Sequence, residues 1–392
     1  MESPLAGEEA TAPTLTQPFE LDGNRLSLCH DGPGLRAMLL DLIDGAQSSL
    51  KLYFYIFATD RSGRQVLARL MRAARRGVDV TLMVDAFGSM ETSAAFLRRL
   101  ERAGGRVGWF GGSWSTRYLI RNHQKMAIAD KKRAIVGGFN VADAYFGDLE
   151  DDCWRDLGVL LEGAEAATLE RWYDMLWNWL SGPFQSFRTL RQLVRGWHDG
   201  RGTFRWLIGG PTYRMSAWAR TVRADLERAR QADLVAAYFS PERGMLARVR
   251  RVARRGRARL ILPSRSDNTT TIAASRLLYG PLLRGTVQIY EYLPCRLHMK
   301  LLVIDNAVYI GSANFDMRSL FLNLEIMLRI EDASLANHIR AFIDDLAAQS
   351  EHVTRDVHRQ RRTGLRLLKG WISYFLVGVL DYKITRRLNI RE

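Results

Sequence analysis

The sequence predicts an α/β protein made of two halves related by a pseudo-twofold axis, each an α/β/α unit with a mostly parallel central sheet. Two observations predict this fold. The pattern H-x-K-x-x-x-x-D occurs at 123–130 and again at 298–305, and each copy is followed by G-[GS]-x-N, at 137–140 and 311–314. Segments with strand and helix character alternate ahead of both copies. A duplication of this kind indicates one active site at the junction of the halves rather than two independent sites.

The first half is expected to alternate strands and helices up to its H-x-K strand. Apolar spacing predicts helices that end at glycines, such as the helix 62–76 that stops at Gly77. A tryptophan-rich helix follows the motif and is expected to pack in the core. The expected elements are strands at 24–29, 49–57 and 78–85 and helices at 34–43, 62–76, 93–103 and 164–180.

The second half repeats this order. The segment A-R-R-G at 253–256 is a near copy of the A-R-R-G at 74–77, and both end a predicted helix. The division predicted from these patterns is a disordered tail at 1–20, a first half at 21–182, a linker at 183–205, a second half at 206–350 and a basic tail at 351–392. The expected elements of the second half are helices at 216–229, 244–255, 272–283 and 333–347 and strands at 234–239, 258–262 and 287–292.

The duplicated motif places charged groups where a buried strand is expected. Residues two apart in a strand point to the same face, so His123 and Lys125 share a face, as do His298 and Lys300. Burying such groups without a partner is unfavourable. Two pairs facing one another around an anion would resolve this problem, because they supply positive charge and proton transfer to a phosphodiester.

Carboxylates are expected to orient the two imidazoles. Asp130 and Asp305 lie seven residues after their histidines, so in regular strands they point away and read as hairpin anchors. Asp156 and Glu325 each open an apolar strand-like run downstream of a motif, and we nominate them as the orienting groups. The alternative interpretation makes Asp156 and Glu325 structural salt-bridge residues.

These motifs resemble the phospholipase D superfamily and, within it, the bacterial cardiolipin synthases. The resemblance extends from about residue 21 to 350. Two features depart from the pattern: Gly138 stands where the second motif has Ser312, and the segment between Asp305 and Gly311 is one residue shorter than its counterpart. The other matching stretches are 52–57, 74–78, 154–156, 209–211 and 314–319.

The resemblance implies two-step phosphatidyl transfer through a covalent phosphohistidine, with no metal and no cofactor. His123 is assigned as the nucleophile and His298 as the acid and base, although the near-symmetry of the motifs leaves their order open. The remaining motif residues complete the implied site. They are Lys125, Asp130, Lys300 and Asp305 in the catalytic set, and Asn140, Asn314 and Ser312 around the phosphate.

Composition points to an anionic partner. The chain of 392 residues has a formal net charge of +15, which favours an anionic membrane surface or nucleic acid. No run of about 18 apolar residues is present to span a bilayer, and residues 1–17 lack the character of a secretory signal. The three cysteines form no metal or disulfide spacing, which fits a reduced compartment.

The end of the chain carries basic residues around the apolar stretch 371–380. This arrangement is expected to lie in a membrane interface, although packing on the protein's own surface is the alternative. Together these features predict a peripheral protein on the cytoplasmic face of the bacterial inner membrane. Its expected substrates are phosphatidylglycerol and phosphatidylethanolamine.

Three functions compete at this stage. The favoured one is a cardiolipin synthase, in which the glycerol of phosphatidylglycerol accepts the phosphatidyl group; with water as acceptor, the same site is a phospholipase D. The second is a nuclease-type phosphodiesterase, supported by net charge alone and therefore less favoured. The third is an inert membrane-binding scaffold, which the two intact motifs disfavour.

Overall fold

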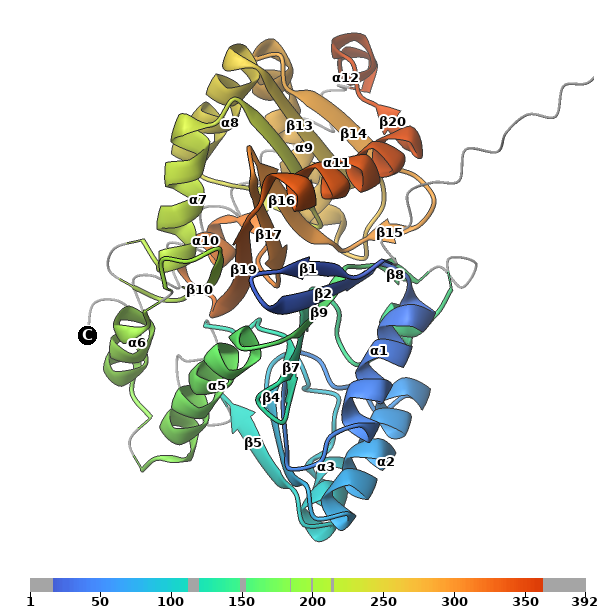
Figure 1. Ribbon diagram of the computed structural model, residues 1–392. Coiled ribbons are helices and arrows are strands. Elements are labelled where there is room, and N and C mark those ends of the chain that lie inside the picture. The colour runs from blue at the N-terminus through green and yellow to red at the C-terminus, as the bar shows by residue number, and fades with distance from the viewer. Residues whose placement is uncertain are drawn as a thin grey trace, which may run out of the picture.

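The computed structural model describes residues 17–111, 120–148, 153–183, 185–198, 200–212 and 215–361. Within them the chain forms two α/β halves that lie one above the other, the first in blue to green and the second in yellow to red (Figure 1). Each half contains one eight-stranded sheet. The α/β class predicted from the sequence is therefore confirmed.

The sheet of the first half has the order β1-β2-β9-β7-β6-β3-β4-β5. Its strands are β1 (Phe19–Leu21), β2 (Asn24–Cys29), β3 (Ser49–Phe54), β4 (Asp79–Asp85), β5 (Arg106–Phe110), β6 (Met126–Ala129), β7 (Arg133–Gly137) and β9 (Gly158–Glu162). The accompanying helices are α1 (Gly32–Asp44), α2 (Arg61–Arg75), α3 (Ala94–Arg102), α4 (Asp143–Phe146) and α5 (Glu165–Ser181). The helix α2 ends as expected before Gly77, whose φ of 91° is readily adopted by glycine.

The sheet of the second half has the order β10-β19-β17-β16-β11-β13-β14-β20. Apart from the edge strands β1 and β20, this order matches that of the first sheet strand for strand, which is the structural mark of the duplication. Its strands are β10 (Phe204–Gly209), β11 (Gln231–Ala236), β13 (Arg257–Pro263), β14 (Gln288–Tyr292), β16 (Lys300–Ile304), β17 (Ala307–Gly311), β19 (Glu325–Glu331) and β20 (Ser350–His352). Its helices are α7 (Ala217–Arg228), α8 (Arg243–Arg255), α9 (Thr269–Arg284), α10 (Met317–Phe321), α11 (Ala333–Ala348) and α12 (Arg355–Arg361).

Strand pairing within each sheet is mixed. The neighbours β3, β4 and β5 pair in parallel, as do β11, β13 and β14, because helices connect them. The strand that follows each H-x-K, β6 or β16, pairs antiparallel with the next strand through a tight hairpin. The same strand pairs antiparallel with β3 or β11 on its other side. Each motif therefore sits at the centre of its sheet.

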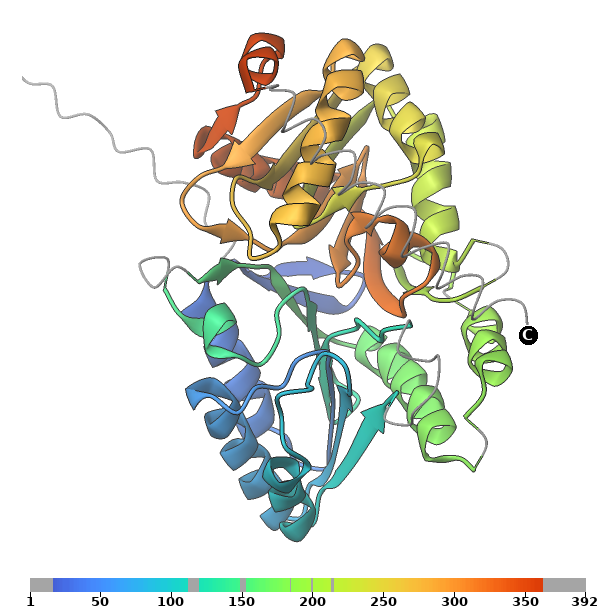
Figure 2. The same ribbon diagram turned by 180° about the vertical axis from the view of Figure 1, so that it is seen from behind.

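Among the described residues, three apolar cores hold the molecule together. One core lies under the outer helices of each half, and the third lies between the two sheets. This shared core includes Ile128 and Leu161 from the first half and Ile326 and Leu328 from the second, together with buried faces of α5 and α11. The halves are thus packed into one body by apolar burial, the main favourable contribution to folding. Seen from behind, the orange helix α9 crosses the outer face of the second sheet (Figure 2).

Two short backbone links also join the halves. Strand β8 (Trp154–Arg155) pairs in parallel with β15 (Arg296–Leu297). Asn122 forms an isolated parallel bridge with Leu324. A second two-stranded pair, β12 (Phe239–Ser240) with β18 (Phe315–Asp316), lies within the second half.

The stretch expected to be a linker contains a packed helix, α6 (Phe187–Gly196). It begins with a capping box, in which Ser186 and Thr189 satisfy each other's backbone N–H groups. Leu190 and Val194 on its inner face are buried in the shared core. Of the predicted tails, 1–20 and 351–392, residues 1–16 and 362–392 lie outside the described residues, whereas β1 begins at Phe19 and α12 spans Arg355–Arg361. None of the helices in the described ranges has the length and apolar character that crossing a bilayer requires.

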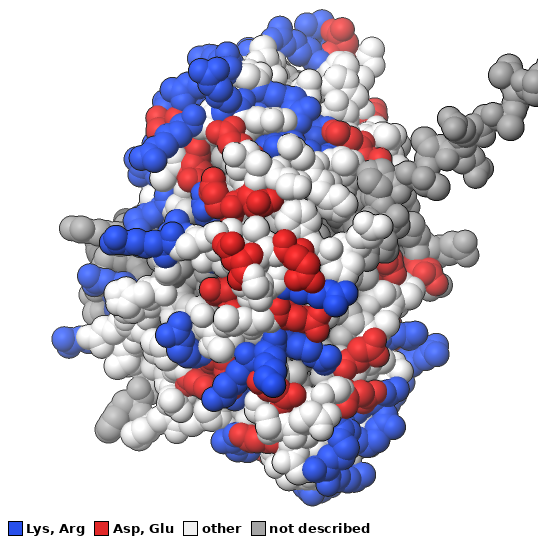
Figure 3. Space-filling view, in the orientation of Figure 1, with Lys and Arg blue, Asp and Glu red and all other residues white. Residues whose placement is uncertain are grey.

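Charged side chains are unevenly distributed over the surface. On the face drawn in Figure 3, Lys and Arg gather over α7 and α8 at the upper left and over α2 at the lower right, while Asp and Glu are frequent across the middle. This face is therefore not one continuous basic surface.

Candidate active site

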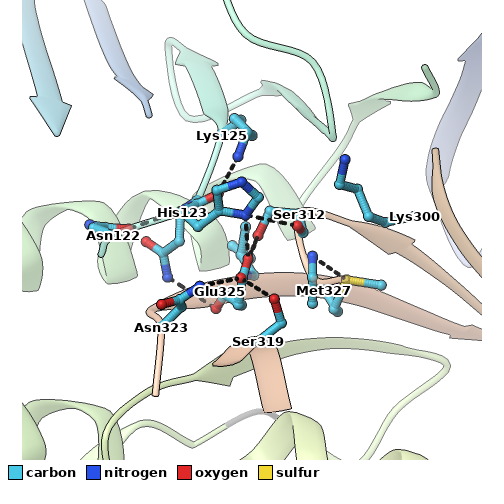
Figure 4. A network of polar contacts seen from close by, with 12 residues as sticks. Asn122, His123, Lys125, Lys300, Ser312, Ser319, Asn323, Glu325 and Met327 are labelled. Atoms are coloured by element: carbon cyan, nitrogen blue, oxygen red, sulfur yellow. Dashed lines mark hydrogen bonds and ion pairs between the residues drawn. The ribbon is translucent and has the colours of Figure 1, made fainter. Parts of the chain in front are cut away.

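The first histidine is held by the opposite half of the molecule. The backbone N–H of His123 donates to the carbonyl of Leu324 at 2.8 Å. The side chain of the next residue, Glu325, then lies with Oε2 3.2 Å from Nδ1 of His123 (Figure 4). A carboxylate on Nδ1 fixes the tautomer that leaves a lone pair on Nε2.

The second histidine repeats this arrangement in reverse. The backbone N–H of His298 donates to the carbonyl of Arg155 at 2.7 Å. Oδ2 of the next residue, Asp156, lies 2.6 Å from Nδ1 of His298. Each orienting carboxylate therefore serves the histidine of the other half. The two carboxylates nominated from the sequence each contact Nδ1 of a motif histidine, and the pairs are crossed between the halves.

Glu325 is fixed by a network of hydroxyl and amide donors. Its carboxylate accepts hydrogen bonds from Oγ of Ser312 at 2.5 Å and Oγ of Ser319 at 2.8 Å, and Asn323 Nδ2 lies 3.5 Å away (Figure 4). These donors stabilise the ionised form. Although burial acts to raise the pKa of Glu325, His123 and Lys125 together with these hydrogen bonds hold it below its usual value.

Ser312 was expected to bind phosphate, and the structure corrects this. A hydroxyl has one proton to donate. Ser312 gives it to Glu325, and its oxygen accepts from the backbone N–H of Ile326 at 3.0 Å. Ser312 therefore positions the carboxylate that orients His123.

Asp156 is held differently from Glu325, because Gly138 stands where the second motif has Ser312 and has no hydroxyl to donate to the carboxylate. Its Oδ1 accepts from the N–H of Leu157 at 2.7 Å. A Cβ atom on Gly138 would lie 2.4 Å from this oxygen and 2.8 Å from Cδ of Lys300. This explains why glycine stands at 138 where the second motif has serine. The carboxylate of Asp156 fills the space that a side chain at 138 would need.

Gly138→Ala is expected to displace Asp156 and Lys300, lowering turnover strongly and destabilising the fold by about 1–3 kcal/mol. Thermal unfolding and turnover measure the two effects. Gly202→Ala is the matched control, because its Cβ would meet nothing within 4 Å. Equal behaviour of the two variants would contradict the proposed crowding at Gly138.

Two buried lysines complete the centre. Lys125 and Lys300 are 1% and 2% exposed. Nζ of Lys125 donates to the carbonyl of His123 at 2.6 Å, and Nζ of Lys300 lies 2.9 Å from Nε2 of His298. Figure 4 shows both ammonium groups on the opposite side of the His123 ring from Glu325. Two cations held in this way form a site for an anion.

Burial shifts the titration of these groups. It lowers the pKa of His123 to about 4, with the positive charge of Lys125 acting in the same direction. It lowers the pKa of Lys300 to about 8 and raises that of Asp156 to about 6. It also lowers the pKa of Lys125 well below its usual value. Near neutral pH His123 is therefore uncharged, while Lys300 carries its charge.

These shifts predict a bell-shaped pH profile of kcat/KM. Below about pH 6 Asp156 takes up a proton and can no longer stabilise a charged His298, and above about pH 8 Lys300 loses its charge. In Lys300→Arg the contribution of Lys300 to the upper limb should be lost, because arginine stays protonated. An upper limb near the ordinary lysine value of 10.5 would contradict this assignment.

The amides predicted to bind phosphate, Asn140 and Asn314, are both buried. Oδ1 of Asn140 accepts from the backbone N–H of Ile56 at 3.0 Å. Asn314 is buried, and its Oδ1 has no hydrogen-bond partner among the described residues. Their contact with a phosphate stays a prediction.

Asp130 and Asp305, counted with the catalytic motif, lie away from the reaction centre. Asp130 accepts from the backbone N–H groups of residues 47–49 at the far end of β6. Asp305 accepts from the N–H groups of Arg230 and Gln231. Five residues of strand, about 16 Å, separate each aspartate from its motif lysine. They are therefore corrected from catalytic residues to hairpin anchors, as their position relative to histidine indicated.

Aromatic rings around the histidines were missed by the sequence reasoning. The ring of Tyr55 meets His123 edge-on at 5.0 Å between centroids. Tyr145 and Trp154 meet His298 in the same way, each at 5.2 Å. Such contacts restrain the orientation of an imidazole. The position of Tyr55 could have indicated its role. It directly follows the carboxyl end of β3, and sites in α/β proteins form at that end of the strands.

A duplicated α/β fold with two histidines, two lysines and crossed carboxylates defines a protein of the phospholipase D superfamily. A family model described as "Cardiolipin synthase, PLD-like domain" matches residues 39–177 and 222–347. The chain belongs to this family and is a phosphatidyltransferase-type enzyme.

Curated relatives agree with this assignment. Cardiolipin synthase A of Pseudomonas entomophila is 29% identical over 363 residues, which are 89% of this chain and 74% of the relative. Cardiolipin synthase A of Pseudomonas putida strain GB-1 is 29% identical over 371 residues, covering 91% and 76%.

Solved structures share the fold. Phosphatidylserine synthase from Haemophilus influenzae superposes with a TM-score of 0.72 at 13% identity, over 93% of this chain and 95% of that one. Polyphosphate kinase from Porphyromonas gingivalis gives a TM-score of 0.55 at 16% identity, over 85% and 49%.

Proposed function

We propose that the protein is a cardiolipin synthase. It transfers a phosphatidyl group from phosphatidylglycerol or phosphatidylethanolamine to the glycerol headgroup of phosphatidylglycerol. The observation that carries the proposal is the pair of crossed histidine–carboxylate contacts around two buried lysines. The name of the relatives, cardiolipin synthase A, supports the choice of acceptor.

In the first step, Nε2 of His123 attacks the phosphorus of the donor lipid. The P–N bond forms as the P–O bond to the headgroup alcohol breaks, and His298 gives that alcohol a proton. The choice of His123 as nucleophile is supported by its greater access, 12% of its side chain against 6% for His298. Its lowered pKa keeps it unprotonated at neutral pH.

In the second step, the glycerol hydroxyl of the acceptor attacks the phosphohistidine. His298 takes the hydroxyl proton, the new P–O bond forms and the P–N bond breaks, which returns both histidines to their starting states. Lys125 and Lys300 bind the non-bridging oxygens, whose negative charge grows in both transition states. Asn140 and Asn314 are proposed to help hold the same oxygens.

His298 must carry a proton to act as the acid, although burial and the two lysines hold its pKa well below its usual value in the free enzyme. The anionic phosphodiester offsets the charge of Lys125 and Lys300. Substrate binding therefore favours protonation of His298, and Asp156 stabilises the resulting imidazolium.

The decisive experiment is product analysis. Purified protein is incubated with phosphatidylglycerol vesicles, with and without phosphatidylethanolamine, and the lipids are identified by mass spectrometry. Cardiolipin as the main product supports the proposal, and its dependence on added phosphatidylethanolamine identifies the donor. Phosphatidic acid alone would mean that water is the acceptor and the enzyme is a phospholipase D. Absence of any lipid turnover would favour a phosphodiesterase acting on nucleic acid.

We further propose that the protein works at the cytoplasmic face of the bacterial inner membrane as a peripheral enzyme. Its lipid substrates and its excess of basic residues support this location. The apolar stretch 371–380, predicted to lie in the interface, is outside the described residues.

A further inference from the structure

A single loop beside the site exposes two large apolar side chains. Among the described residues, the large apolar side chains with substantial exposure are Met90 at 70%, Leu293 at 52% and Phe87 at 37%. Phe87 and Met90 both lie in the loop 86–92 that follows β4. Clustered exposure of this kind marks an interaction surface more often than scattered single residues do.

The loop holds these side chains outward by rigid contacts. Oδ1 of the buried Asp85 accepts from the N–H groups of Phe87 and Gly88, both at 2.9 Å. The hydroxyl of Ser89 donates to the carbonyl of Tyr55 at 3.1 Å, and that of Thr92 to the carbonyl of Phe57. Ser89 and Thr92 are buried while Met90 between them is not. These contacts hold the loop backbone in place and leave the side chains of Phe87 and Met90 exposed.

The same loop is attached to the reaction centre. Oδ2 of Asp85 accepts from the N–H of Asn122, the residue before His123, at 2.9 Å. A Cβ on Gly88 would lie 2.2 Å from the carbonyl oxygen of Tyr55, whose ring meets His123. The exposed apolar pair thus borders the approach to the nucleophile.

Arg121 supplies a positive charge at this border. Its guanidinium carbon lies 4.3 Å from the centre of the Phe87 ring, and its buried Nε has no hydrogen-bond partner among the described residues. Asn122 is bridged to Leu324 in an extended conformation, so Arg121 and His123 point to the same side. Two residues of extended chain span about 6.6 Å, a separation that a glycerol bridge between two phosphates can cover.

We propose that Phe87, Met90 and Arg121 form the surface through which the site meets an anionic phospholipid bilayer. Phe87 and Met90 enter the apolar layer, and Arg121 binds the phosphate of the acceptor lipid while His123 carries the phosphatidyl group. This inference rests on the proposed function. The partner is a bilayer because apolar contact and phosphate binding are needed side by side.

Vesicle binding tests the apolar part. In a His123→Ala background, which prevents turnover, the double change Phe87→Ser and Met90→Ser should weaken flotation with phosphatidylglycerol vesicles by roughly ten- to a hundredfold. Leu293→Ser is the matched control, because it removes an exposed apolar side chain beside Gln349 in the other half. Unchanged binding of the double variant, with unfolding temperatures alike, would overturn the assignment. Because binding is measured without turnover, this result is independent of the proposed reaction.

Product partition tests the role of Arg121. Arg121→Gln should lower the ratio of cardiolipin to phosphatidic acid by about tenfold or more, because the acceptor lipid loses a charged contact and water does not. Both products form from the same phosphohistidine, so their ratio is unaffected by a general loss of activity. An unchanged ratio would exclude Arg121 from acceptor binding. If the unaltered protein makes neither product, the proposed function fails, whereas the vesicle result still stands.

Discussion

His123→Ala and His298→Ala are each expected to abolish phosphatidyl transfer while leaving the fold intact. Loss of the nucleophile removes the covalent route, and loss of the acid–base group is expected to reduce turnover by on the order of 10⁴-fold. Turnover of phosphatidylglycerol and thermal unfolding are the measurements. Substantial transfer by either variant would refute a shared site.

The two variants are expected to differ when the leaving group needs no proton. With a p-nitrophenyl phosphodiester, His298→Ala should still release nitrophenol rapidly in the first turnover and accumulate the phosphohistidine. His123→Ala should give no such burst. The opposite pattern would mean that His298 is the nucleophile, and it would exchange the two assigned roles without removing the mechanism.

The second large effect is expected at the crossed carboxylates. Glu325→Gln and Asp156→Asn should each lower turnover by about 10²- to 10⁴-fold, because an amide cannot stabilise a charged imidazole or fix its tautomer. The crossing gives a sharper expectation. Glu325→Gln should slow the burst of the first step as His123→Ala does, whereas Asp156→Asn should spare it as His298→Ala does.

A double-mutant cycle checks the crossing directly. Asp156→Asn should cause little further loss of turnover in a His298→Ala background, because the effects of contacting residues are not additive. It should cause a large further loss when combined with a conservative change in the other pair, His123 and Glu325. Asp174→Asn serves as a control, since this carboxylate pairs with Lys51 near the surface. If Asp156→Asn were instead non-additive with a change of His123, the observed pairing would be contradicted.

Much of the site could be predicted because its residues recur in two copies at fixed spacings. The strand period placed each lysine beside its histidine and turned Asp130 and Asp305 away from it. The crossed pairing could not be predicted, because 142 residues separate Asp156 from His298 and 202 separate His123 from Glu325. Only the packing of the two sheets brings these partners together.

Other features could not be predicted because they depend on packing between residues that are distant in the sequence. The sequence revealed Gly138 as a departure from Ser312, but not that a carboxylate fills the space of the missing side chain. The glycine, proline and charges of the stretch 183–205 predict a linker, whereas its inner apolar residues pack α6 onto the core. The α/β class follows from the alternation of elements, while β7 and β17 are antiparallel to β6 and β16 because tight hairpins follow each motif.

The crossed pairs also bear on how such an enzyme could arise. A single half carries a histidine and a carboxylate that do not contact each other, so alone its imidazole would have no carboxylate to orient it. Two identical copies related by a twofold axis would form both pairs at once. Once the two copies are joined in one chain, their sequences can diverge from each other. The aspartate beside Gly138 and the glutamate beside Ser312 are two separate solutions that an exact dimer could not combine.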